Sequence, residues 1–331
     1  MRELNIGKQE AGQRLDKFLE KYMDLAPKSF FYKMLRKKNI TLNNKKAEGN
    51  ERLEIDDQVK LWLAEETIES FRSNKKEAVM TELHAMKKKA KSEQLDIIFE
   101  NEHILLINKP AGMLSQKAKK DDISLIEHLT SYLIESGQLT EEQLSTFKPG
   151  ICNRLDRNTS GIIVAGKSLY GLQTMGEQLK NRDLDKYYYC IVKGKIEKKQ
   201  LIDGYLYKNK NRNKVTITKE KVEDSDYIKT EYEPIKCNDN FTLLRVKLIT
   251  GRSHQIRAHL QSIGHPIIGD GKYGDKYVNR EMKKKYQLDH HLLHARELHF
   301  KEMPNGLEDL ANKEILAPLP KYFDAIIKKE F

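Results

Sequence analysis

The segment ICNRLDRNTSGIIVAG constrains the fold more than any other part of the chain. Its apolar run Ile162–Ala165 predicts a β-strand, and the polar residues Asn158–Gly161 predict the turn that enters this strand. Such a turn needs only the asparagine, serine and glycine, yet Asp156 stands just before it, between Arg154 and Arg157. The segment therefore predicts a strand together with a functional group at its start.

Residues 95–331 contain many strand-like runs and a few helical ones. Two β-rich runs lie between Leu95 and Gln116, and a Pro-Ala-Gly turn follows them. We therefore expect an α+β fold, with a mixed domain built on a largely antiparallel sheet. The other candidate strands are 160–168, 186–196, 214–220, 230–237 and 241–250, and the candidate helices are 124–136 and 251–264.

Residues 1–63 predict a small, independent α/β unit of two short helices and short strands. We expect Phe31, Leu35 and Met34 to form the buried side of the second helix. Its solvent side carries Lys33, Arg36 and Lys37, the charges that contacts to phosphate would need. Residues 64–94 are highly charged and contain no proline or glycine, which predicts a linker between this unit and the domain at 95–331.

The charge balance favours a polyanionic partner. The chain has 60 Lys and Arg against 49 Asp and Glu, a net charge of +11, which suits nucleic acid but also a soluble basic protein without such a partner. No apolar run approaches the roughly 18 residues of a membrane span, and no secretory signal is recognisable. Three cysteines without C-x-x-C spacing indicate reduced thiols. We therefore expect a cytoplasmic protein with no membrane partner.

Four segments, in order, resemble the motifs of the RluA-type pseudouridine synthases. NRLDRNTSGIIVAGKS is similar to their R-L-D-x-x-T-S-G motif, and the other three segments are 107–116, 186–194 and 251–274. The N-terminal unit resembles the small RNA-binding domain named after the fourth small-subunit ribosomal protein, with Asp56-Asp57 in place of the usual Gly-Asp. The resemblance implies an enzyme that rebonds the sugar of a uridine from ring nitrogen to carbon 5. This reaction has no redox change and needs no cofactor.

The resemblance also implies the catalytic residues. Asp156 is the catalytic carboxylate, and its chemistry leaves open whether it acts as a nucleophile or as a base. Arg257 occupies the family position of the cation that keeps such a carboxylate ionised, with Arg252 as the alternative. On its helix, Arg257 shares a face with His254. Tyr188 is implied to stack on the target base or to hydrogen-bond near the carboxylate.

RNA contacts are implied in the same way. Arg154 would fill the place of a uridine flipped out of its stack, and Asn108 and Lys109 would form a turn near the site. Asn153 stands where many relatives have histidine, so no proton transfer is assigned to this position. The predicted RNA contacts are Arg154, Asn108, Lys109, Arg252, His254, Lys33, Arg36 and Lys37.

A metal site is not expected. His290 and His294 are spaced for two ligands on a helix, but their segment reads as a strand and contains no H-E-x-x-H pattern.

We therefore expect a pseudouridine synthase that acts as a monomer on large-subunit ribosomal RNA. Two alternatives stay open: a transfer-RNA pseudouridine synthase, and a non-catalytic RNA-binding factor of ribosome assembly. A glycoside hydrolase would normally need two carboxylates flanking the bond, and only Asp156 lies in a matching motif.

Overall fold

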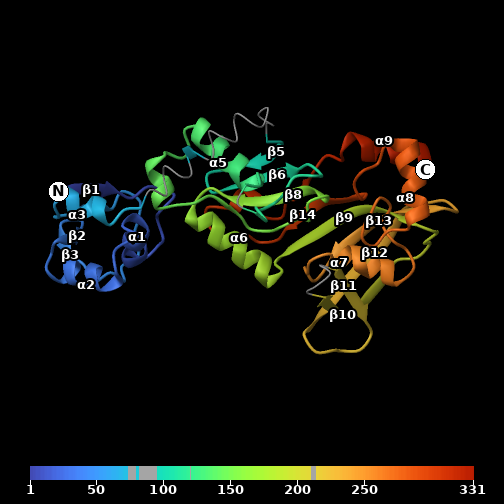
Figure 1. The fold of residues 1–331 in the computed structure, drawn as a ribbon, viewed down its shortest axis with the longest axis horizontal. Helices are drawn as coiled ribbons and strands as arrows, with labels where there is room; N and C mark the ends of the chain where they lie inside the picture. Colours follow the sequence, from blue (N-terminus) through green and yellow to red (C-terminus); the bar gives the residue numbers. More distant parts are fainter. Residues whose placement is uncertain (74–79, 82–94, 120, 210–213) are drawn as a thin grey trace.

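The computed structural model describes residues 1–73, 80–81, 95–119, 121–209 and 214–331. The described residues form two β-sheets with separate hydrophobic cores, and Figure 1 shows the smaller sheet at the N-terminal end of the molecule. The predicted linker contains helix α3 (Glu65–Ser70), and most of its remaining residues lie outside the described part of the chain. None of the described helices is both long enough and apolar enough to cross a membrane.

The N-terminal unit packs helices on a four-stranded antiparallel sheet of order β1-β4-β2-β3. In helix α2, the predicted side of Phe31, Met34 and Leu35 is buried. Asn43 and Asn44 have φ values of 51° and 61° in the turn from β2 to β3, where the hairpin needs left-handed backbone. The elements are β1 (Arg2–Asn5), α1 (Leu15–Tyr22), α2 (Lys28–Arg36), β2 (Ile40–Leu42), β3 (Lys45–Lys46) and β4 (Gln58–Leu61).

The larger sheet has eleven strands, of which nine follow the order β11-β10-β12-β13-β9-β14-β8-β6-β5, with β15 beside β14 and β7 beside β8. Its pairing is largely antiparallel, so the expected α+β architecture is confirmed. The strands are β5 (Ile97–Glu100), β6 (Ile104–Lys109), β7 (Gly150–Ile151), β8 (Ser160–Gly166), β9 (Leu184–Lys193), β10 (Gln200–Asn209), β11 (Lys214–Thr218), β12 (Ser225–Cys237), β13 (Phe241–Leu248), β14 (Leu293–Phe300) and β15 (Glu314–Leu316). The helices are α5 (Leu125–Glu135), α6 (Leu169–Asn181), α7 (Gln255–Ser262), α8 (Lys276–Tyr286) and α9 (Lys321–Glu330).

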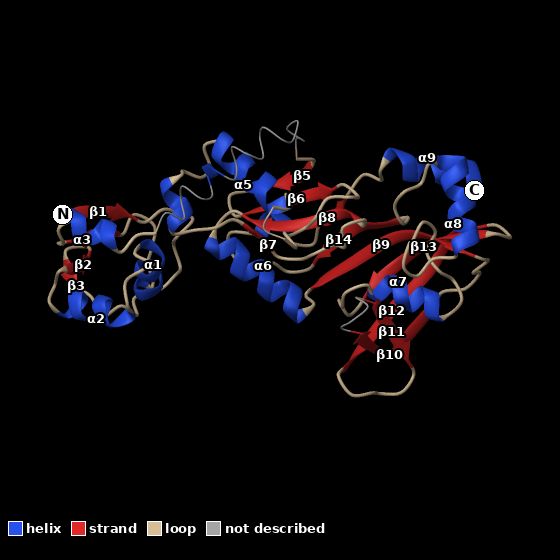
Figure 2. Cartoon of the chain, in the orientation of Figure 1, coloured by secondary structure: helices blue, strands red, loops and turns tan. Residues whose placement is uncertain are grey.

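Strand β14 joins the two halves of the larger sheet, because it lies between β9 and β8 (Figure 2). It runs antiparallel to β9 and parallel to β8. At the contact with β8, Gly161 has a φ of 112°, and a Cβ atom there would lie 2.2 Å from the carbonyl oxygen of Ala295. Only glycine fits this approach. Strand β8 begins directly after the turn that carries Asp156, so β14 also fixes the position of that turn.

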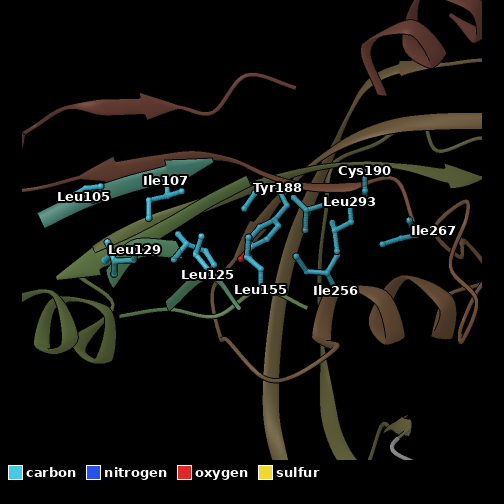
Figure 3. Packing of buried hydrophobic residues seen from close by; sticks show 14 of the residues in the cluster. Leu105, Ile107, Leu125, Leu129, Leu155, Tyr188, Cys190, Ile256, Ile267 and Leu293 are labelled. Carbon is cyan, nitrogen blue, oxygen red and sulfur yellow. The ribbon is translucent and has the colours of Figure 1, made fainter. Parts of the chain in front are cut away.

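The largest hydrophobic core lies where this sheet meets helices α5 and α7. Figure 3 shows the Tyr188 ring among the side chains of Leu155, Ile256 and Leu293, which come from a loop, helix α7 and strand β14. The capping box of Ser124 and Glu127 begins helix α5, whose leucines pack in the same core. The core therefore extends to Leu155, the residue directly before Asp156.

Residues 7–11 attach the N-terminal unit to the larger domain. The side-chain amide of Gln9 donates to the carbonyl of Gln138 at 2.8 Å. The carboxylate of Glu10 is 4% exposed and accepts a hydrogen bond from the Thr146 hydroxyl at 2.8 Å. Burial raises the pKa of Glu10. These bonds place the N-terminal unit against the residues between α5 and β7.

Candidate active site

Asp156 lies in the loop between β7 and β8, and two hydrogen bonds hold the end of this loop. The backbone N–H of Thr159 donates to the carbonyl of Asp156 at 3.0 Å, which closes the turn. The Thr159 hydroxyl lies 2.7 Å from Nε2 of His291, and both residues are buried. Burial lowers the pKa of His291 to about 4, so its imidazole is neutral at pH 7. The Asp156 carboxylate is thus held by a rigid loop while its side chain stays partly exposed.

Arg257 from helix α7 holds the carboxylate from the other side. Its Nη1 atom lies 2.7 Å from Oδ2 of Asp156. The rest of the guanidinium is fixed by the buried Asp270, with Nε–Oδ2 and Nη2–Oδ1 distances of 2.6 and 2.9 Å. Burial alone would raise the pKa of Asp270, but the bonds and charge of Arg257 hold it at about 2. A bidentate pair of this kind fixes both position and orientation, so Asp270 aims Arg257 at Asp156.

His254 also lies beside the Asp156 carboxylate. It adopts a φ of 59° at the start of α7, and its Nε2 atom lies 3.9 Å from Oδ2 of Asp156. The Tyr273 hydroxyl accepts a hydrogen bond from the backbone N–H of Val215 at 2.9 Å and lies 3.0 Å from Nδ1 of His254. The hydroxyl proton is then free to bond Nδ1. Burial lowers the pKa of His254, and in the neutral tautomer that follows the Nε2 proton faces Asp156.

Tyr188 forms the apolar wall of the site. It is 7% exposed, and its ring packs in the core shown in Figure 3. Burial, and then the charge of Asp156, raises the pKa of its hydroxyl, so the phenol is neutral at pH 7. Its neighbours on strand β9 point the other way, because side chains alternate along a strand: the centroid of the Tyr187 ring lies 3.7 Å from the Arg245 guanidinium carbon.

These residues line an open cleft of about 930 Å³. Among its described lining residues, Asp156 is the one carboxylate, whereas eight are Lys or Arg. The cationic lining residues are Lys117, Arg154, Arg157, Lys186, Lys208, Arg252, Arg257 and Lys272. A polyanion such as RNA fits this charge distribution.

The predicted RNA contacts fall into three groups. Arg154, Arg252 and His254 line the cleft; Arg154 is exposed and makes no hydrogen bond or ion pair with the described residues, whereas Arg252 pairs with Asp226 at 2.9 Å. Outside the cleft, in the N-terminal unit, three predicted contacts are exposed along and just after α2. They are Lys33, Arg36 and Lys37.

In the third group, the structure contradicts the predicted RNA contact of the buried Lys109, whereas that of the partly exposed Asn108 stays a prediction. Both end strand β6 instead of forming a turn, and neither lines the cleft. Lys109 is fully buried, and its ammonium donates to the carbonyls of Pro110, Met113 and Arg157 at 2.9, 2.9 and 3.1 Å. An ammonium enclosed in this way cannot reach a phosphate. The amide of Asn108 instead donates to Asp96 at 2.8 Å.

Asp270 is a site residue that the sequence alone did not reveal. It lies in the segment 251–274 that carries the last family motif, but spacing does not show that it turns back to Arg257. Asn153 ties the start of the Asp156 loop to strand β8. Its side-chain amide donates to the carbonyl of Ile162 at 3.2 Å and accepts from the backbone N–H of Val164 at 2.7 Å.

The described residues contain no cluster of three or more histidine, cysteine or acidic side chains placed to hold a metal ion. His294 is instead buried on strand β14, with Nδ1 2.8 Å from the Ser160 hydroxyl and Nε2 3.3 Å from the carbonyl of Ala317.

Comparisons with known proteins identify the family of the chain. A family described as RNA pseudouridylate synthase matches residues 103–262. The chain is 31% identical to the ribosomal large subunit pseudouridine synthase C of Haemophilus ducreyi, over 98% of this chain and 94% of that protein. It is 30% identical to the protein of the same name from Escherichia coli, over 90% and 88%.

A solved structure has the same fold. The human RNA pseudouridylate synthase domain containing 4 superimposes with a TM-score of 0.57 at 19% identity, covering 76% of this chain and 96% of that one. The chain belongs to the RNA pseudouridine synthases, enzymes that isomerise uridine in RNA.

Proposed function

We propose that the protein converts uridines of large-subunit ribosomal RNA to pseudouridine, with Asp156 as the catalytic carboxylate. The observation that carries this proposal is the Asp156–Arg257 contact of 2.7 Å in a cleft whose described lining includes eight Lys or Arg residues and no other carboxylate. The names of the relatives from Haemophilus ducreyi and Escherichia coli support the choice of RNA. Because an enzyme that modifies this RNA acts where ribosomes are assembled, we propose that the protein is cytoplasmic. We also propose that it acts as a monomer.

The reaction breaks the bond from sugar C1′ to ring N1, forms the bond from C1′ to C5, and moves the C5 proton to N1. Asp156 either bonds the nucleotide or removes a proton from the sugar, and both roles need a carboxylate held at one position. Arg257 holds the carboxylate at that position, because Asp270 fixes its Nε and Nη2 atoms and leaves Nη1 directed at Asp156. Tyr188 offers its ring edge and a neutral hydroxyl to the base.

The target uridine must be flipped out of its base stack before Asp156 can reach it, and this unstacking costs a few kcal/mol. Arg154 is two residues from Asp156, is exposed in the cleft and makes no contact with the described residues that would restrain it. We assign it the place that the uridine leaves. The charges along α2 lie at the far end of the molecule in Figure 1, and we assign them to a separate stretch of the same RNA.

The test replaces Asp156 by asparagine in the only gene copy and maps pseudouridine across ribosomal and transfer RNA. We expect the pseudouridines that depend on this gene to vanish from large-subunit RNA. The matched control is Asp289→Asn, which alters an exposed carboxylate paired with Lys283 and should leave the map unchanged. Modification that persists in Asp156→Asn would contradict the catalytic assignment, and loss confined to transfer RNA would contradict the substrate.

A further inference from the structure

Lys186 is a cation of the cleft to which the motifs give no role. It lies near the start of strand β9, two residues before Tyr188, so both side chains leave the strand on the same side. Both line the cleft that contains Asp156. The Lys186 side chain reaches the loop before α7, since a Cβ atom on Gly251 would be 3.7 Å from its Nζ atom.

The Lys186 ammonium is half-buried and has no hydrogen bond or ion pair with any described residue. Among the described lining residues of the cleft, the one carboxylate, Asp156, is bonded to Arg257 at 2.7 Å. Asp185, the neighbour of Lys186 on the strand, points to the opposite face and pairs with Lys247 at 2.7 Å. Burial, and then the charge of Arg182, lowers the pKa of Lys186. An anion delivered by a ligand would supply the missing partner.

RNA brings such an anion to this place. Two residues of extended strand span about 6.6 Å, so Lys186 lies roughly one nucleotide's reach from the Tyr188 ring. A base resting against Tyr188, with its sugar at Asp156, extends its phosphates away from the apolar wall. We propose that the Lys186 ammonium binds a backbone phosphate adjoining the target uridine and is a positioning residue of the enzyme. This inference rests on the proposed site at Asp156.

The test compares the wild-type protein, Lys186→Gln and Lys186→Arg on an RNA fragment that the wild-type protein modifies. We expect Lys186→Gln to raise the Kd for this RNA about tenfold at physiological salt, as for one lost charged hydrogen bond. Its kcat should change much less. The slope of log Kd against log salt concentration should fall by about 0.7, the share of one phosphate contact to a single strand. Lys186→Arg should keep the wild-type slope.

Two further readouts separate this role from a structural one. Removing an unpaired, half-buried charge relieves its desolvation, so the melting temperature of Lys186→Gln should equal or exceed that of the wild type. The control Lys193→Gln, on the opposite face of β9 and paired with Asp275, should leave the salt slope unchanged.

The proposal is overturned if Lys186→Gln keeps the full salt slope, binds RNA normally, or melts several degrees lower than the wild type. The fragment is chosen because the wild-type protein modifies it, whether it comes from ribosomal or transfer RNA. A wrong substrate assignment would therefore leave this comparison intact, and a wrong Asp156 assignment would appear separately in Asp156→Asn.

Discussion

Replacing Asp270 by asparagine tests whether a second carboxylate holds the proposed catalytic pair together. Asp270 is 1% exposed, and Arg257 holds its pKa at about 2 against an ordinary value of 3.8. A pKa lowered this far corresponds to about 2 kcal/mol of stability at pH 7. Because the folded pKa is the lower one, this stability is present above pH 3.8 and is lost as the pH falls through about 2.

The expected result is a pH-dependent difference between the wild type and Asp270→Asn. The free energy of unfolding should differ by about 2 kcal/mol at pH 7, or roughly 4–8 °C in melting temperature, and by about half as much at pH 3. Urea unfolding followed by circular dichroism measures this. Fluorescence would report on the wrong part of the chain, because Trp62, the one tryptophan, lies in the N-terminal unit.

The same substitution should also slow catalysis. An amide can accept only one of the two Arg257 bonds and opposes the other with its own N–H groups, so Nη1 is no longer aimed at Asp156. We expect kcat to fall by tenfold to a hundredfold. Asp289→Asn, an exposed ion pair, should change neither stability nor kcat measurably. An equal stability difference at pH 3 and pH 7, or an unchanged kcat, would refute the reasoning.

Two other substitutions test the backbone around the site. Gly161→Ala should destabilise the protein by about 3 kcal/mol or more in a thermal melt, because the new Cβ atom would collide with Ala295. The control Gly176→Ala, in open space on α6, should be neutral or stabilising by up to about 1 kcal/mol. Wild-type stability in Gly161→Ala would contradict the packing of β8 on β14. Lys109→Met should lower the free energy of unfolding by about 2–4 kcal/mol, because three buried carbonyls lose their hydrogen-bond donor. The salt dependence of RNA binding should stay unchanged, and a lower salt slope would show that Lys109 does contact a phosphate.

Local patterns predicted the elements well where one face of an element is buried. The helix predicted at 251–264 forms at Gln255–Ser262, where Ile256 and Leu260 lie in the core. The turn at Asn43-Asn44 also follows from local preference. Each of these depends on residues within a few positions of one another, which is what periodicity and turn chemistry report.

Long-range pairing was beyond the sequence. Nothing in the spacing of Asp270 shows that it folds back on Arg257, and nothing around Leu293–Phe300 shows that this strand enters the middle of the sheet. The predicted RNA contact of Lys109 was wrong for a related reason. The three carbonyls that enclose its ammonium belong to backbone segments that only the fold brings together, so the sequence does not distinguish this lysine from an exposed one.

The central position of β14 has a consequence for how the enzyme comes into being. A nascent chain that has been translated past Arg257 already contains every residue of the proposed catalytic pair. The half-sheets beside these residues are still unjoined, because the strand between β8 and β9 starts only at Leu293. Activity should therefore appear late in synthesis. A chain released before Leu293 would expose two unpaired sheet edges and would not be a partly active enzyme. The site can therefore form only after the chain has been synthesised through Phe300.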